Sequence, residues 1–74
     1  MNEEQYMAEY NKLIDLKKDE LVEIYMNLAY TKKALNTTSE YGKFLLSKER
    51  EGLLELKKST LAMMIIQKKE EAFK

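Results

Sequence analysis

Apolar residues recur along the first half of the chain at the spacing of an amphipathic helix. A large apolar residue returns at every seventh position, and a second apolar position follows three residues later. This a/d spacing is typical of helices that pack along a narrow seam. The seam residues are Met7, Tyr10, Ile14, Leu21, Ile24, Leu28 and Leu35. No segment sustains the two-residue alternation of a strand, so the pattern predicts an all-α fold.

The second half carries a wider apolar stripe. Leu46, Leu53, Leu56 and Met63 keep the a/d spacing, and further leucine, methionine and isoleucine residues lie beside them. A wider stripe indicates contact with more than one neighbouring helix. The consecutive apolar residues 63–66 point in four directions around a helix. We expect a second copy of the chain to cover them, in a homodimer that forms a four-helix bundle.

One strong turn signal divides the chain into two nearly equal halves. Residues 36–39 are Asn, Thr, Thr and Ser, which favour caps and turns, and Thr37 with Glu40 has the form of a capping box. Asn2 with Gln5 gives a similar signal at the start. The sequence therefore predicts a single domain, 1–74, built as an antiparallel hairpin of two long helices. They would span about residues 3–35 and 40–73, with a turn at 36–39.

A weaker signal would interrupt the first helix. Asp19 follows two lysines and could begin a new helix, and Lys17 falls on the apolar seam. The interval from Ile14 to Leu21 nevertheless stays in phase, which favours one continuous helix. A break near Lys17–Asp19 is the alternative.

Length and composition bound how the fold is stabilised. The chain has 74 residues, with 13 basic and 13 acidic side chains and neither Cys nor His. A domain of this size buries only about 60% of its unfolded surface and usually needs disulfides, a metal or oligomerisation. Without Cys and His, disulfides are excluded and the usual zinc sites nearly so. We therefore expect association with a second copy or with a larger partner.

Candidates for catalytic or cofactor chemistry are few. The side chain that titrates near neutral pH and the most reactive nucleophile are both missing. The pairs Asp15/Asp19 and Glu51/Glu55 lie on common helix faces, but a di-iron bundle also needs Glu-x-x-His. Two isolated glycines cannot build a phosphate-binding loop. We expect no enzymatic activity, no cofactor and no metal.

Neither a membrane span nor a signal peptide is predicted. The longest apolar run, residues 61–66, is far shorter than the roughly 20 residues that cross a bilayer. The first residues are acidic, where a signal peptide would be basic and then apolar. These features predict a cytoplasmic protein. The strong preference for lysine over arginine is typical of AT-rich genomes, such as those of low-GC bacteria and their phages.

Tyrosine and methionine provide the candidate binding residues. The chain has five of each and no tryptophan, and both types are enriched in interfaces. A two-helix hairpin cannot bury Tyr6, Tyr10, Met63 and Ile66 together, so we expect them in a partner or dimer interface. Met64 belongs to the same cluster but fits a bundle core equally well. The predicted function is a non-enzymatic regulator or adaptor, encoded by a phage or mobile element, that inhibits or scaffolds a host protein.

Nucleic-acid binding is the alternative function. Lys17, Lys18, Lys57 and Lys58 fall at the same level of the predicted hairpin and could contact phosphates of DNA as part of a dimeric transcriptional regulator. Against this, the chain has no net positive charge, and Arg50 is its one arginine.

Overall fold

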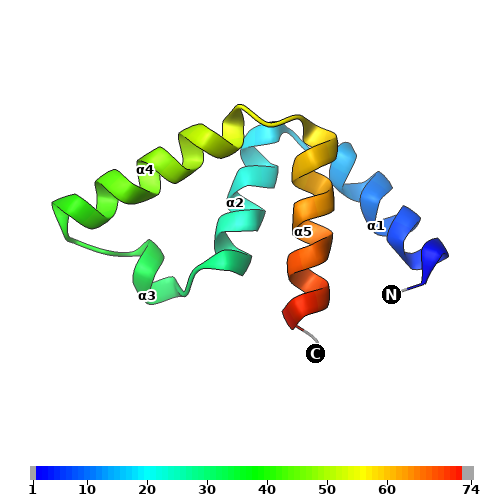
Figure 1. Ribbon diagram of the computed structural model, residues 1–74, viewed down its shortest axis with the longest axis horizontal. Coiled ribbons are helices and arrows are strands. Elements are labelled where there is room, and N and C mark those ends of the chain that lie inside the picture. The colour runs from blue at the N-terminus through cyan, green and yellow to red at the C-terminus, as the bar shows by residue number, and fades with distance from the viewer. Residues whose placement is uncertain (1, 73–74) are drawn as a thin grey trace.

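Five helices account for most of the residues that the structure describes. The structure is a computed structural model, and it describes residues 2–72 (Figure 1). The helices are α1 (Glu3–Ile14), α2 (Lys18–Ala29), α3 (Lys32–Leu35), α4 (Glu40–Leu54) and α5 (Lys58–Ala72). Within 2–72 there are no strands, so the predicted all-α class is confirmed. Phe73, near the end of the predicted second helix, lies outside the described residues.

Local capping signals set the start of α1 and α4. The side chain of Asn2 accepts a hydrogen bond from the backbone N–H of Gln5 at 2.8 Å. The side-chain oxygen of Gln5 in turn accepts from the backbone N–H of Asn2, which completes the predicted capping box. The cap of α4 is Ser39, whose hydroxyl accepts from the N–H of Gly42. Thr37, expected as this cap, accepts instead from the N–H of Ser39. The turn at 36–39 is therefore confirmed, and its capping residue differs from the one expected.

Both predicted long helices are interrupted. The first is divided at residues 15–17, where a break was the alternative, and again at 30–31; the second is divided at 55–57, where none was expected. At the two matching turns, Leu16 and Leu56 pack against the core. The ammonium group of Lys18 donates to the carbonyl oxygen of Leu54 at 3.0 Å, which joins the start of α2 to the end of α4. Tertiary packing therefore overrides the local preference for continuous helix.

The two interruptions belong to a repeated unit. Residues 13–21 and 53–61 share the pattern Leu-x-x-Leu-Lys-Lys-x-x-Leu. The backbone repeats as well, since Asp15 has φ −78° and ψ −13° and Glu55 has φ −77° and ψ −16°. The chain thus contains two units of similar local structure, each made of two helices joined by a matching turn: α1 with α2, and α4 with α5, connected through α3.

Each outer helix packs against the inner helix of the other unit. α2 and α5 lie side by side and run in the same direction, while α1 packs on α5 and α4 packs on α2 (Figure 1). Glu9 of α1 binds Lys69 of α5, and Arg50 of α4 binds Glu23 of α2 at 2.8 Å. The outer pairs, α1 with α5 and α4 with α2, are antiparallel, as the predicted hairpin requires. The central pair is parallel, which a simple hairpin does not predict.

The core draws matching residues from both units. Its buried side chains are Leu13, Leu21, Val22 and Met26 from the first unit and Leu53, Leu61, Ala62, Ile65 and Ile66 from the second. Because α2 packs along α5, Ile65 and Ile66 are covered within one chain, whereas we expected a second copy to cover them. Two predicted seam residues, Met7 and Leu28, are exposed, since the break at 15–17 changes which face turns inward. The four-helix-bundle homodimer stays a prediction.

The four longer helices form one thin layer. The Cα positions extend over 43 × 27 × 13 Å, and the layer runs in the order α4, α2, α5, α1 (Figure 1). The radius of gyration is 13.3 Å. A compact domain of this length would have about 11 Å. The arrangement therefore leaves both broad faces of the layer open and lets the start of α4 extend beyond the core.

Candidate functional site

The five residues predicted to form an interface do not share one exposed surface. Tyr6 and Tyr10 are half-buried against the core, and their rings stack with centroids 6.5 Å apart. Met64 is also half-buried, and Ile66 is only 1% exposed. Met63 is 54% exposed. Ile66 is therefore a core residue, which corrects its expected place in an interface, and Met63 alone of the five is largely open to solvent.

The two lysine pairs predicted to contact nucleic acid lie at the same end of the layer. They are Lys17–Lys18 and Lys57–Lys58, at the adjoining starts of α2 and α5 (Figure 1). The ammonium group of Lys18 donates a hydrogen bond to the carbonyl oxygen of Leu54. Carboxylates occupy the same turns and the first turn of α2, at Asp15, Asp19, Glu20 and Glu55. The positive charge of the lysines is therefore matched locally by negative charge.

The ion pair between Glu9 and Lys69 joins α1 to α5 at the opposite end. Both side chains are partly buried. The hydrogen bond from Lys69 lowers the pKa of the Glu9 carboxyl below its ordinary value, with a smaller opposing effect from desolvation. The pair therefore stabilises the folded state while Glu9 is ionised.

The largest exposed apolar side chains cluster on the first half of α4. Tyr41, Phe44 and Leu45 are 71%, 54% and 48% exposed. Their spacing puts them on one face of the helix, and the ammonium group of Lys48 lies 5.6 Å from the centroid of the Phe44 ring. We call this segment, residues 40–48, the α4 wing. The wing carries apolar surface that residues 2–72 leave uncovered.

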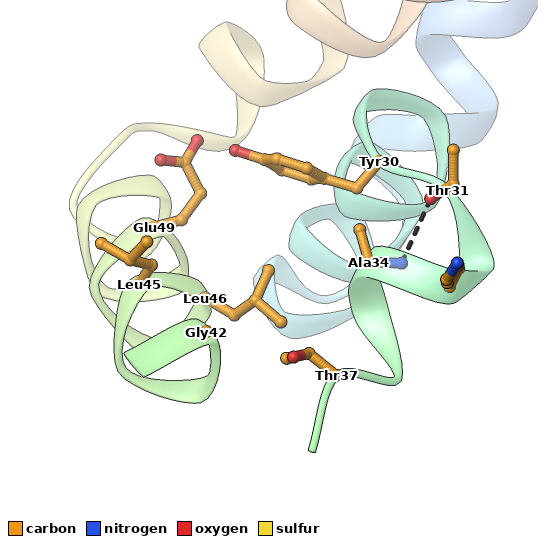
Figure 2. Close-up of a pocket in the computed structure, with 9 residues that line it drawn as sticks. Tyr30, Thr31, Ala34, Thr37, Gly42, Leu45, Leu46 and Glu49 are labelled. Atoms are coloured by element: carbon orange, nitrogen blue, oxygen red, sulfur yellow. Dashed lines mark hydrogen bonds between the residues drawn. The ribbon is translucent and has the colours of Figure 1, made fainter. Parts of the chain in front are cut away.

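A groove lies beside the wing, between α3 and α4. Its volume is about 640 Å³. Its lining includes Tyr30, Lys33, Ala34, Leu45, Leu46 and Glu49. Figure 2 shows the ring of Tyr30 extending across the groove, with its hydroxyl group toward Glu49, and Leu46 projecting from α4. The groove is thus mainly apolar, with charged groups at its edges.

The groove exists because α2 ends early. Tyr30 has an extended backbone, with φ −127° and ψ 152°, and Thr31 caps α3 by accepting from the N–H of Ala34 at 3.1 Å. This cap starts a new helix in a different direction. In the repeated unit, the residue equivalent to Ala29 is Lys69, and α5 continues beyond it to Ala72. The first half of α4 therefore lacks the support that α1 receives from α5.

The described residues offer little for catalytic or metal chemistry. No group of three or more acidic side chains within 2–72 is arranged to hold a metal ion. A smaller pocket of about 210 Å³ beside Arg50 and Glu23 is bordered by their ion pair. No helix in this range is both long and apolar enough to cross a membrane. The wing and its groove are therefore the candidate site.

Sequence reasoning missed the wing because it sought surplus apolar residues at the other end of the predicted hairpin. The wide apolar stripe predicted for the second half includes Leu45 as a packing residue, and Tyr41 and Phe44 fall outside that stripe. A usable signal was present, since Tyr41, Phe44 and Leu45 share a helix face with Gly52 and do not lie on the face of Leu46 and Leu53. Two apolar faces on one helix indicate that only one of them packs against the core.

Comparisons with known protein families, with curated proteins and with solved structures found no match to this chain.

Proposed function

We propose that the protein is a cytoplasmic, non-enzymatic regulator or adaptor that binds another protein through the α4 wing. The observation that carries this proposal is the exposure of Tyr41, Phe44 and Leu45 on a helix segment beyond the core. Apolar anchors at helical spacing are what helix-in-groove recognition uses. Aromatic anchors of this kind supply much of the free energy of binding at protein interfaces.

The shape of the molecule supports a mechanism of occlusion or scaffolding. The wing extends from a thin layer, so a partner can pack on it without displacing the core. Inserting the wing into a partner's groove would block that groove to other ligands, which is inhibition by occlusion. The partner in this proposal is a host protein, and the chain is encoded by a phage or mobile element.

Two variants with matched exposure test the proposal. Phe44 and Met63 are each 54% exposed, on α4 and α5 respectively. We would compare Phe44→Glu and Met63→Glu by affinity capture at native expression, with circular dichroism as the check on folding. We expect Phe44→Glu to lose a stoichiometric partner and Met63→Glu to retain it. A hot-spot residue costs about 2 kcal/mol or more when it is lost, which is roughly thirtyfold in affinity.

The other outcomes contradict the proposal in distinct ways. Loss of the partner with Met63→Glu alone would move the interface to the α5 surface predicted from the sequence. A homodimer that Phe44→Glu dissociates, with no foreign protein captured, would assign the wing to self-association. Sedimentation velocity at several concentrations measures that dimer directly.

DNA binding is a second candidate, favoured by one observation. The starts of α2 and α5 lie side by side and bring Lys17 and Lys57 to one end of the layer (Figure 1). Phosphate contacts there would make the affinity fall steeply with salt. The experiment is a mobility shift on duplex DNA at low salt, with Lys57→Glu as the variant. Absence of a shift, or a shift unchanged by the variant, would exclude this role for the lysines.

A further inference from the structure

The groove between α3 and α4 has a filled counterpart in the same molecule. The repeat that relates the two units matches Leu46 to Tyr6 and Ala29 to Lys69. At the filled place, Tyr6 packs against the core, and α5 continues past Lys69 to Ala72. At the groove, α2 has already ended at Ala29. The open space therefore corresponds to a turn of helix that the other unit supplies from within the chain.

The charges around the groove indicate what such a helix should carry. Between Glu23 and Glu40 the chain has no acidic residue but has Lys32 and Lys33. Lys33 lines the groove and is exposed, and within residues 2–72 it forms no ion pair. An ammonium group at the edge of an apolar groove favours a ligand that brings a carboxylate to it.

The opposite wall sets the orientation of that ligand. Glu49 lies on the α4 side, where Figure 2 shows the Tyr30 hydroxyl directed toward it. A carboxylate of the ligand would be repelled on this side and attracted on the α3 side. The apolar part of the lining, at Ala34 on α3 and at Leu45 and Leu46 on α4, suits leucine-type anchors.

We infer that the groove binds a short acidic helical segment of a partner protein, with apolar anchors on Leu45 and Leu46 and a carboxylate paired with Lys33. This inference rests on the proposed function, because it takes the partner to be a protein that also reaches the wing. It goes further in giving the chemistry of the segment that is bound.

The probe is a pair of synthetic helical peptides, acetylated and amidated at their ends. Both carry leucine at i, i+3, i+4 and i+7; one has glutamate at its polar positions and the other has lysine. Binding is measured by isothermal titration, and the site is mapped by backbone amide shifts in NMR spectra. We expect the acidic peptide to bind about tenfold more tightly than the basic peptide, because Lys33 attracts the first and repels the second. The shifts should concentrate in residues 30–34 and 45–49.

Charge reversal supplies the decisive variant. Lys33→Glu should reverse the preference between the peptides, whereas Lys43→Glu should preserve it, because Lys43 is exposed on α4 and does not line the groove. Both lysines are exposed, so neither change should unfold the chain. Lys33→Gln, which removes the charge without reversing it, should abolish the preference.

Each remaining result overturns the inference. These results are equal affinity for the two peptides, binding mapped away from the groove, a preference that Lys33→Glu leaves intact, and no binding by either peptide. The proposed function fails separately, when capture shows no partner that depends on Phe44. If the peptides fail while capture succeeds, the wing binds a protein and the groove does not take an acidic helix.

Discussion

Gly42 of α4 lies directly against Thr37 in the turn before it. A Cβ atom added at Gly42 would be 2.8 Å from both the Oγ1 and the Cγ2 atoms of Thr37 and 3.3 Å from its Cβ atom. Rotating the threonine side chain cannot relieve contacts with both of its branches, so the backbone would have to move. The N–H of Gly42 is also held by the hydroxyl group of Ser39 at 3.2 Å. Close packing of the turn on α4 therefore requires glycine here.

We predict that the two glycines respond to alanine in opposite directions. Gly42→Ala should lower the free energy of unfolding by about 1 kcal/mol, because overpacking costs more than the gain in helix propensity. Gly52→Ala should raise it by about 0.5–1 kcal/mol, because among residues 2–72 no atom outside the adjoining helix backbone lies within 4 Å of the added Cβ atom. Urea unfolding followed by circular dichroism measures both. Thr37→Ala combined with Gly42→Ala should recover stability, and a stabilised Gly42→Ala single variant would contradict the packing argument.

The Glu9–Lys69 pair should make stability depend on pH at the acidic end. The pKa of Glu9 is lowered in the folded state by the hydrogen bond from Lys69. Its stabilising contribution is therefore complete above the pKa that Glu9 has when unfolded, and it is lost as the pH falls through the folded value. Glu9→Gln should cost up to about 1 kcal/mol at neutral pH and progressively less on acidification.

The control for this prediction is another carboxylate in a more exposed pair. Glu51 lies 3.4 Å from Lys48 on the surface of α4, with both side chains more exposed than those of the Glu9 pair. Glu51→Gln should change the urea midpoint little at any pH. A Glu9→Gln effect that persists unchanged in acid would show that packing, rather than the ion pair, is responsible.

The link between Lys18 and Leu54 predicts a difference between two lysines that the repeat makes equivalent. Lys18 donates to a carbonyl oxygen at the end of α4, where the helix leaves such groups without partners. Lys18→Met should cost about 0.5–1 kcal/mol of stability. Lys58→Met, at the matching position of α5, should cost less, since Lys58 is exposed. Thermal unfolding of the two variants makes the comparison, and equal losses would contradict a specific role for Lys18.

The sequence indicated the all-α class, the cap of α1 and the central turn because these depend on local chemistry. Asn2 accepts from the backbone N–H of Gln5, three residues away, so its immediate neighbours specify it. At the central turn the sequence located the turn, but Ser39 rather than Thr37 caps α4. The break at 55–57 lacked such a signal, because its residues are ordinary helix formers. Leu56 leaves the helix to pack against the core, which only the tertiary structure specifies. Residues 53–61 repeat the pattern of 13–21. A break near Lys17 therefore implies a second break at the equivalent position, near Lys57.

The candidate site was harder to predict because it depends on where helices end. The spacing of Tyr41, Phe44 and Leu45 is visible in the sequence, but only the packing of α4 on α2 shows that their face of α4 is left open. The groove beside them follows from the end of α2 at Ala29. Conversely, Ile66 was expected at an interface because the hairpin had only one neighbouring helix to offer. With both long helices divided, α5 gains α1 and α2 as neighbours. The division of the long helices therefore buries Ile66, which was expected at an interface, and opens the groove where α2 ends.

The repeated core predicts equal losses at equivalent leucines. Leu21 and Leu61 are fully buried at matching positions of the two units, so each Leu→Ala change should cost a similar 2–5 kcal/mol, approximately. A domain of this length has a total stability of only about 4–11 kcal/mol, so each variant should lose a large share of it and unfold at a clearly lower temperature. Leu28→Ala is the control, since Leu28 is partly exposed and lies outside the core. Urea and thermal unfolding measure all three, and a large difference between Leu21→Ala and Leu61→Ala would show that the two units contribute unequally to the core.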